Sequence, residues 1–334
     1  MTEEIEKIVL SGDRPTGRLH LGHLVGSLKS RVELQKKYTQ FVMIADVQAL
    51  TDNAENPEKV RSNIVEVAMD NIAVGVDPKR TTFFIQSQIP HIAELTIFFL
   101  NLVTLSRLKR NPTVKDEMKQ KGFGEDVPAG FLMYPVSQAA DILFLRADYV
   151  PVGADQLPMI EQTNEIVRKF NAVYGETFKE VEPIMGDASR LVGIDGKAKM
   201  SKSLSNAIYL SDSARTVEEK VMQMYTDPAH IRKEDPGKVL GNTVFQYLDV
   251  FDPNKEELAD LKKRYEVGGV GDVEVKKRLS LLLNDLLDPV RDLREKLNPK
   301  DVMEILNEGS KKAEGVGGRT LLYVKEKMGI NYFN

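Results

Sequence analysis

The feature that most constrains the fold is a regular alternation of short apolar segments and amphipathic helices through the first hundred residues. Three segments, at 8–10, 41–46 and 81–86, are almost continuously apolar, which is typical of strands buried on both faces. This strand and helix order predicts an α/β fold with a parallel sheet covered by helices on both faces. Ligands of such sheets bind beyond the carboxyl ends of the strands, so we expect residues 13–23 and 46–51 to border a site.

The pattern predicts about five strands followed by an all-helical region. Two further helices and two further strands continue the alternation, at 131–145, 158–170, 149–152 and 181–184. Strand signals largely vanish beyond about residue 205, where helical segments alternate with glycine and proline breaks. We therefore predict a Rossmann-like, doubly wound parallel sheet in residues 1–205 and a helical domain in residues 206–334.

A polar stretch in the first domain breaks the alternation. Residues 107–121 hold six basic side chains against two acidic ones, inside an insertion of residues 107–128. By its residues alone, this stretch is interpreted as a solvated surface loop. The net charge of −4 argues against a broad nucleic-acid-binding surface, although a local basic patch can still bind RNA. Two basic triplets, 262–264 and 276–278, are either such a patch or solvated helix faces.

Composition and motif searches exclude several protein classes. The chain has no cysteine, which excludes disulfides and cysteine metal sites and fits a reducing cytoplasm. No apolar run approaches the ~18 residues of a membrane span, and the acidic start at 1–4 is unlike a targeting peptide, so no membrane association is expected. The phosphate-binding loop Gly-x-x-x-x-Gly-Lys-Ser/Thr and the Gly-x-Gly-x-x-Gly fingerprint are both absent. An ordinary P-loop NTPase or dinucleotide-binding enzyme therefore lacks support.

The first chemical motif lies at 15–23, where the first predicted strand ends and a helix begins. His20 and His23 are two of only four histidines in the chain, and Gly22 lies between them. A helix start presents unpaired N–H groups and a positive dipole end to an anion, and glycine allows close approach to the backbone. The geometry predicts a nucleotide site. Two exposed histidines at a helix start are the alternative, and nothing completes a protein metal site around them.

The second motif is the basic run Gly-Lys-Ala-Lys-Met-Ser-Lys-Ser at 196–203. Lysines are compact point charges on flexible stems, so in a mobile loop they can follow charge from one phosphate to the next. A basic loop alone is commonplace. This one lies about 180 residues after the histidine motif, at the far end of the same α/β region, and the pairing is what makes both informative.

Together, the two motifs resemble the signatures of the class I aminoacyl-tRNA synthetases. His20-Leu21-Gly22-His23 differs from the His-Ile-Gly-His signature at one apolar position, and Lys199-Met200-Ser201-Lys202-Ser203 matches the second signature in full. Within the class, the chain is most similar to the bacterial tryptophan-specific family over essentially its whole length. Further segments that carry the resemblance are 11–17, 134–135 with 139–142, 150–156 and 160–163.

The resemblance implies an ATP site formed by both motifs and by the end of the fourth strand. The implied ATP-binding residues are Arg14, Pro15, Thr16, Gly22, His23, Gly153, Ala154, Asp155, Leu191, Lys199, Met200, Ser201, Lys202 and Ser203. The implied catalytic groups are His20, His23, Lys199 and Lys202, which would stabilise charge on the phosphates during attack at the α-phosphate. Mg²⁺ would be bound through ATP and pyrophosphate, with no protein metal site.

The resemblance also implies a tryptophan pocket. Its implied residues are Asp141, Tyr134, Gln138, Gln156 and Gln48. Indole offers one ring donor and no acceptor, so a buried carboxylate at Asp141 would distinguish tryptophan from phenylalanine. Without the resemblance, Asp141 would be interpreted as a structurally paired residue. Many bacterial tryptophan enzymes differ at positions 23, 48 and 138, and the spacing Tyr134-x-x-x-Gln138-x-x-Asp141 also resembles tyrosine-specific enzymes.

The implied activity is two-step acyl transfer. L-Tryptophan and ATP would form tryptophanyl-AMP and pyrophosphate, and tRNA(Trp) would then accept the tryptophanyl group. The implied partners also include a second copy in a homodimer, with the helical domain 206–334 reading the anticodon. The alternatives are a tyrosine-specific enzyme and a catalytically inactive RNA-binding relative, which differ in the amino acid, if any, that supports ATP–pyrophosphate exchange.

Overall fold

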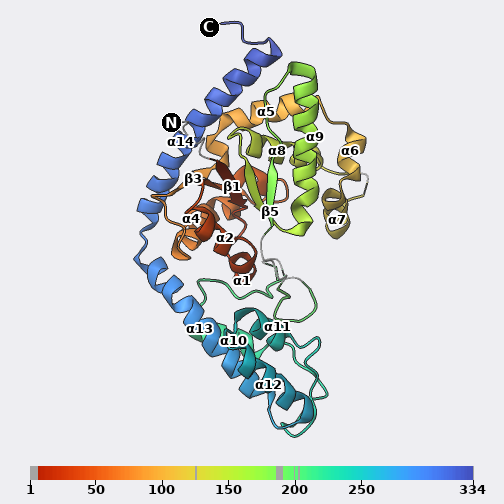
Figure 1. Cartoon of the computed structure of the whole chain (residues 1–334), viewed down its shortest axis with the longest axis vertical. Helices are drawn as coiled ribbons and strands as arrows, with labels where there is room; N and C mark the ends of the chain where they lie inside the picture. Colours follow the sequence, from red (N-terminus) through yellow and green to blue (C-terminus); the bar gives the residue numbers. More distant parts are fainter. Residues whose placement is uncertain (1–6, 125, 186–190, 199, 202–203, 334) are drawn as a thin grey trace. The chain divides into compact units, whose positions relative to one another are not determined.

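The structure is a computed structural model that describes residues 7–124, 126–185, 191–198, 200–201 and 204–333 (Figure 1). Contacts divide the chain into two compact units. Unit 1 comprises Met1–Gly17, Ser27–Gly186 and Asn298–Asn334, and unit 2 comprises Arg18–Gly26 and Asp187–Leu297. The predicted single boundary near residue 205 differs from this division, because 298–334 returns to unit 1 and 18–26 belongs to unit 2. In the described residues, no helix has the length and apolar character needed to cross a membrane.

Unit 1 is built on a parallel sheet of five strands, which confirms the predicted fold class. The strands are β1 (Ile8–Asp13), β2 (Thr39–Ile44), β3 (Thr81–Ile85), β4 (Tyr149–Val152) and β5 (Glu182–Met185). Their spatial order is β3-β2-β1-β4-β5, so the winding reverses between β1 and β4. In open α/β sheets, the ligand crevice lies at such a reversal.

The carboxyl ends of three neighbouring strands lie in register. Asp13 of β1 is opposite Ile44 of β2, and Ile44 is opposite Ile85 of β3. The segments that follow these strands therefore leave the sheet at one edge. This confirms that the segments after residues 13 and 45 begin at the carboxyl edge of the sheet. The segment that starts at Gln86 begins at the same edge.

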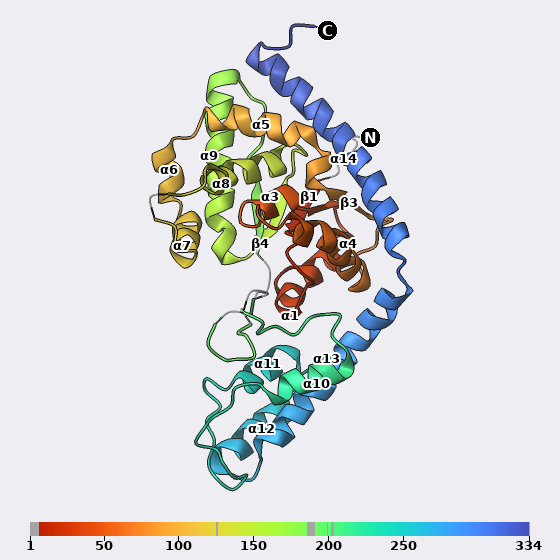
Figure 2. The ribbon, with the colours of Figure 1, turned by 180° about the vertical axis from the view of Figure 1, so that it is seen from behind.

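Helices pack against both faces of the sheet (Figure 1, Figure 2). Those of unit 1 outside the insertion are α2 (Lys29–Leu34), α3 (Asp46–Leu50), α4 (Pro57–Ala73), α5 (Pro90–Leu100), α8 (Ala129–Leu143), α9 (Leu157–Tyr174) and α14 (Pro299–Met328). Phe41 and Phe84 join one apolar core with α5, α8, α9 and α14, whereas their neighbours Val42 and Phe83 are buried on the opposite face. Burial of both faces explains the near-continuous apolar character of these strands.

The edge strand β3 is covered by α14, which Figure 1 shows running beside it. The Ile85 N–H donates to Ser310 Oγ at 3.1 Å. Gly309 allows the two backbones to approach closely, since a Cβ at this position would stand 1.8 Å from the Phe83 carbonyl oxygen. An uncovered edge strand exposes unpaired hydrogen-bonding groups. This contact explains why the last helix belongs to the unit that contains the sheet.

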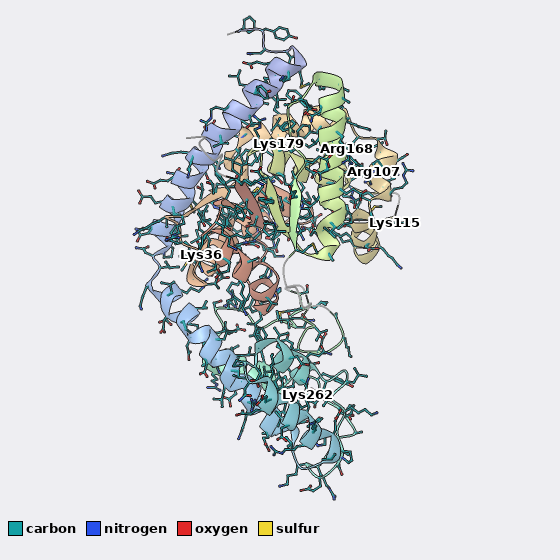
Figure 3. All side chains as sticks on the ribbon, viewed as in Figure 1. Lys36, Arg107, Lys115, Arg168, Lys179 and Lys262 are labelled. Carbon is teal, nitrogen blue, oxygen red and sulfur yellow. The ribbon has the colours of Figure 1, made fainter. Side chains whose placement is uncertain are left out.

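The polar stretch 107–121 is helical, so its interpretation as a loop is wrong. It lies in α6 (Leu105–Arg110) and α7 (Pro112–Gln120). Thr104 and Asn111 cap the two helix N-termini with their side-chain oxygens, a signal that the basic character of the stretch obscured. Arg107, labelled in Figure 3, donates two 2.8 Å hydrogen bonds to the Glu165 carboxylate on α9. The insertion is therefore a folded part of unit 1.

Unit 2 is helical in the part of the chain that is described. Its helices are α1 (Leu21–His23), α10 (Ala214–Met222), α11 (Thr243–Phe251), α12 (Lys255–Val267) and α13 (Asp272–Lys296). A π-helical turn, Leu24–Leu28, follows α1. Beyond Met185, the described residues form isolated bridges but no strand, as predicted. One such bridge joins His20 to Tyr209 and ties the short segment 18–26 to unit 2.

Candidate active site

The loop predicted to bind ATP begins at a buried ion pair. Asp13, the last residue of β1, accepts hydrogen bonds from Arg31 Nη2 at 3.1 Å and from Asn71 Nδ2 at 3.0 Å. Arg31 is only 1% exposed, and Arg31 Nη1 donates to Asn71 Oδ1 at 2.7 Å. A buried guanidinium and a buried carboxylate each need such partners, because neither is solvated. The network holds the start of the Arg14-Pro15-Thr16 segment at the carboxyl edge of the sheet.

Arg14 and the basic insertion meet at one carboxylate. Asp52 Oδ2 lies 3.5 Å from Arg14 Nη1 and 2.7 Å from Lys121 Nζ. Burial alone would raise the pKa of Asp52, but the hydrogen bond from Lys121 and the charge of Arg14 bring it below its usual value. Lys121 was not among the predicted site residues, and its place in the basic insertion was the signal that could have identified it.

Asp141 lies on α8 and is only 2% exposed. Gln86 Nε2 donates to Asp141 Oδ1 at 2.7 Å. Burial raises the pKa of Asp141 to about 7, against the lowering effect of this hydrogen bond, and the charge of Asp46 raises it further. A carboxyl group with a strongly raised pKa at the carboxyl edge of a sheet is typical of a ligand site.

Gln86 also joins Asp141 to another predicted site residue. Its Oε1 accepts the backbone N–H of Gln48, on α3, at 2.9 Å. The structure therefore brings Gln48 and Asp141 together through a residue that sequence analysis treated only as the end of a strand. Its position directly after a buried strand, at the edge where ligands bind, was the signal that could have identified it.

Tyr134, Gln138 and Asp141 are on the same side of α8, at the spacing of successive helical turns. Tyr134 is buried in a small apolar cluster with Phe131, while Gln138 is half-buried. Burial and the nearby Glu117 carboxylate raise the pKa of the Tyr134 hydroxyl, which makes no well-formed hydrogen bond to a described residue. One side of the helix thus presents three groups that could contact an amino acid.

The predicted residues after β4 form a separate part of the same edge. Gly153 precedes a short 3₁₀ helix, Ala154–Gln156, in which Asp155 is exposed and Gln156 is half-buried. The Asp155 carbonyl accepts the Thr113 hydroxyl of α7 at 2.9 Å, so the insertion also supports this turn. In the described structure, no hydrogen bond links Gln156 to the other predicted tryptophan-binding residues.

In unit 2, His20 and His23 cap each other at the start of α1. His20 Nδ1 accepts the Gly22 N–H at 3.1 Å, and His23 Nδ1 accepts the His20 N–H at 3.2 Å. An Nδ1 that accepts leaves the ring proton on Nε2, which suits donation to a phosphate oxygen. No group of three or more potential metal ligands occurs in the described residues, and this pair is explained by helix capping.

The two sequence motifs meet within unit 2. A Cβ at Gly22 would stand 2.9 Å from the His20 ring and 3.6 Å from Met200 Sδ. Met200 is buried, and its N–H donates to the Leu191 carbonyl at 3.1 Å, while the Ser201 N–H donates to Asn206 Oδ1 at 2.9 Å. The predicted residues Lys199, Lys202 and Ser203 lie outside the described residues. Residues about 180 positions apart in the chain are thus neighbours at the histidine motif.

The sequence profile of the family "tRNA synthetases class I (W and Y)" matches residues 2–288. The match covers most of the chain, so the chain belongs to this family, and the predicted class is confirmed. Members of this class are ATP-dependent ligases of an amino acid and tRNA, and this activity is consistent with the parallel sheet and paired motifs described above.

Within the family, the chain belongs with the tryptophan–tRNA ligases. The tryptophan–tRNA ligase of Clostridium longisporum is 58% identical, covering 98% of both chains, and that of Streptococcus pneumoniae TIGR4 is 56% identical, covering 98% of this chain and 99% of the relative. Among solved structures, tryptophanyl-tRNA synthetase from Campylobacter jejuni, complexed with ADP and tryptophan, is 32% identical with a TM-score of 0.84, covering 96% of this chain and 99% of that one. A tyrosyl-tRNA synthetase from Aeropyrum pernix, 20% identical with a TM-score of 0.67 over 91% of this chain and 90% of its own, shares the fold alone.

Proposed function

We propose that this tryptophan–tRNA ligase recognises the indole N–H of L-tryptophan with Asp141. The observation that carries the proposal is the state of its buried carboxylate: Gln86 donates to Oδ1, and no described group donates to Oδ2. Because little of this carboxyl group is in contact with solvent, a ligand N–H that reaches Oδ2 would form a strong, charge-assisted hydrogen bond. Indole carries one such donor. Phenylalanine carries none, so its binding would leave the acceptor unpaired.

Other residues are proposed to complete the two substrate sites. Tyr134 and Gln156 would contact the ammonium group of tryptophan, while Gln138 and Gln48 would border the ring. On the ATP side, Arg14, Pro15 and Thr16 would contact the nucleotide, and Gly153, Ala154 and Asp155 its ribose. Leu191, Met200, Ser201 and Ser203 would line ATP beside the histidine motif, with Gly22 allowing close approach to the backbone.

The reaction needs no protein nucleophile. The tryptophan carboxylate attacks the α-phosphorus of ATP, the bond to the bridging oxygen of the β-phosphate breaks, and pyrophosphate leaves. A ribose hydroxyl of tRNA then attacks the acyl carbon and AMP leaves. Catalysis of the first step rests on positioning and on stabilising charge. His20 and His23 would donate through Nε2, and Lys199 and Lys202 would stabilise the charge that develops on the leaving pyrophosphate.

Mg²⁺ is proposed to enter with ATP rather than through a protein site. The described residues offer no cluster of three potential ligands, so the phosphate oxygens of the nucleotide would supply the first ligands. Phosphate oxygens are the hard donors that this ion prefers, and one or two protein groups commonly complete its shell. The ion would neutralise part of the charge on the pyrophosphate.

ATP–pyrophosphate exchange with different amino acids tests the specificity. We expect exchange to depend on tryptophan, to be weak with phenylalanine and to fall at least ~100-fold in Asp141→Asn at limiting tryptophan, because discrimination by a buried donor–acceptor pair is large. Exchange that tyrosine supports equally well would contradict the proposal. Exchange with no amino acid would instead support a catalytically inactive relative.

The role of the histidine motif is tested at its glycines. Gly22→Ala should lower the rate of adenylate formation by ~10-fold or more, because the new Cβ would lie 2.9 Å from the His20 ring and must displace it. Gly26→Ala is the matched control, since nothing lies within 4 Å of its Cβ position. Equal effects of the two changes would contradict a special role for Gly22.

Lys202→Ala tests the second motif. A residue that acts mainly in the transition state should lower the rate of adenylate formation far more than it lowers ATP affinity. We therefore expect a rate loss of ~100-fold or more with ATP binding changed by less than ~3-fold. Equal losses in both quantities would show that Lys202 contributes only ground-state binding.

The helical unit is proposed to contact tRNA at its anticodon, through stacking and base-edge contacts. Much of the charge of the two basic triplets is engaged within the protein: Lys262, labelled in Figure 3, pairs with Asp249, and Arg278 pairs with Asp252. Lys263 and Lys277 are exposed. Reversing the charge of both should weaken tRNA charging without changing ATP–pyrophosphate exchange, whereas unchanged charging would exclude these triplets from the contact.

We also propose that the enzyme is a homodimer and works in the cytoplasm, where its tRNA substrate is used in translation. Support for the dimer comes from membership in the family alone. Sedimentation equilibrium at micromolar concentration should give twice the 37.5 kDa chain mass, and a monomer at all concentrations would refute the dimer.

A further inference from the structure

Gln86 is buried between the two sides of the proposed tryptophan pocket. It is the first residue of the 3₁₀ turn Gln86–Gln88, directly after β3, and is only 2% exposed. Both ends of its amide are used: Nε2 donates to Asp141 Oδ1 at 2.7 Å, and Oε1 accepts the Gln48 N–H at 2.9 Å. The opposite amide orientation would place an oxygen against a carboxylate and an NH₂ group against an N–H. The two partners therefore determine the orientation of the amide.

The hydrogen bond to Asp141 determines which carboxylate oxygen is available. Because Oδ1 is engaged by Gln86, Oδ2 is the atom left to receive a ligand donor, and the plane of the carboxylate is restrained. A neutral amide achieves this without adding a positive charge, so the carboxylate keeps its negative charge for the ligand when it is ionised. A lysine or arginine at this position would pair with that charge and compete with a weak donor such as an indole N–H.

Gln86 also couples α3 to Asp141. A second contact fastens α3 to the same segment, since Asp46 Oδ1 accepts the Ser87 N–H at 2.9 Å. This second hydrogen bond joins Ser87 to Asp46 and does not involve Asp141. Loss of the Gln86 amide would therefore free the carboxylate while one attachment of α3 to the segment after β3 remains.

We propose that Gln86 is a positioning residue that sets amino-acid specificity: it orients the Asp141 carboxylate toward the ring N–H of the substrate and holds Gln48 against the same pocket. The inference rests on the proposed role of Asp141. A residue that only stabilises the fold would affect all substrates alike, whereas a positioning residue affects tryptophan and spares ATP.

The test compares Gln86→Met with Gln40→Met. Methionine has a similar volume and no hydrogen-bonding amide. Gln40, near the start of β2, is a matched control. It is also buried, at 1% exposure, and it donates one 2.9 Å hydrogen bond to Thr81 Oγ1. The chain contains no tryptophan, so the fluorescence of added L-tryptophan reports its binding without a background from protein indole.

We expect Gln86→Met to raise the Kd and KM for tryptophan by ~10- to 100-fold, the range of a hydrogen bond to a charged group, with the KM for ATP changed by less than ~2-fold. The preference for tryptophan over 1-methyltryptophan, which lacks the ring donor, should fall by a similar factor. Gln40→Met should lower the melting temperature and leave these constants unchanged.

Gln86→Glu gives a second readout in a side chain of the same shape. In this variant, a protonated carboxyl group at position 86 can still donate to Asp141. An ionised carboxyl group at position 86 would instead repel the Asp141 carboxylate, which already lies near the charge of Asp46. Tryptophan affinity in this variant should therefore fall as the pH rises from 6 to 8.5, and Gln86→Met should lack this fall.

Four outcomes would overturn the inference. A tryptophan KM within ~3-fold of the wild type in Gln86→Met, or parallel changes for tryptophan and ATP, would make Gln86 a structural residue. If Asp141→Asn weakens tryptophan binding and Gln86→Met does not, the inference fails while the role of Asp141 stands. If neither change affects binding, the role proposed for Asp141 fails as well.

Discussion

The raised pKa of Asp141 predicts that Asp141→Asn changes stability in a strongly pH-dependent way. Asparagine can still accept the Gln86 hydrogen bond through its side-chain oxygen, but it cannot ionise. In the wild type, the pKa of Asp141 rises from 3.8 to about 7 on folding, mainly because the carboxylate loses its hydration. Over the interval between these values, the folded state retains a proton that the unfolded state has lost.

The size of the effect follows from the width of that interval. Stability falls with pH wherever the folded state binds more protons than the unfolded one. Each pKa unit corresponds to about 1.4 kcal/mol, so an interval of about three units predicts a loss of ~4 kcal/mol in the wild type. The contribution of Asp141 is fully present below its unfolded pKa near 4 and is lost as the pH rises through about 7. About 1 kcal/mol of this loss has already occurred by pH 4.5, so the stability of Asp141→Asn relative to the wild type should rise by ~3 kcal/mol between pH 4.5 and 8.

Urea unfolding followed by far-UV circular dichroism at pH 4.5, 6 and 8 measures this difference. Asp52→Asn is the control, because the pKa of Asp52 is lowered in the folded state. Its stabilising contribution is present above the unfolded pKa of 3.8 and is lost only as the pH falls through the lower folded pKa, so the relative stability of this variant should stay nearly constant between pH 4.5 and 8. A difference between Asp141→Asn and the wild type that stays within ~1 kcal/mol across the pH range would refute the argument from burial.

Two further predictions concern the framework of unit 1. Arg31→Met should destabilise the protein by ~3–5 kcal/mol in urea unfolding, because it leaves the Asp13 carboxylate buried without its charged partner; if the loss is below ~1 kcal/mol, water reaches Asp13 in the folded state. Gly309→Ala should lower the melting temperature strongly, since the new Cβ would stand 1.8 Å from a carbonyl oxygen of β3, whereas Gly315→Ala, whose nearest neighbour is a flexible arginine end at 3.9 Å, should stabilise α14 by up to ~1 kcal/mol. Similar effects of the two alanines would show that α14 does not pack closely on the edge strand.

The local sequence pattern was sufficient to predict the sheet and the chemistry of the two motifs. The near-continuous apolar strands 41–46 and 81–86 required burial on both faces, so the parallel sheet followed from the period of the sequence alone. The histidine and lysine motifs likewise required no tertiary information, because their residue types and order carry the resemblance. The polar stretch 107–121 shows the limit of this reasoning, since its high charge concealed two capped helices.

Only the tertiary structure decided which residues from distant segments act together. The sequence identified Asp141 and Gln48 as candidates, but Gln86, which joins them, is 38 residues from one and 55 from the other. Similarly, α14 belongs with the sheet because Gly309 and Ser310 fit the edge of β3, a contact across more than 220 residues. Helical or strand periodicity reports which face of a segment is buried, because burial repeats along the chain. It does not report which segment covers that face, because partner choice depends on shape and hydrogen bonding between residues that are neighbours only after folding.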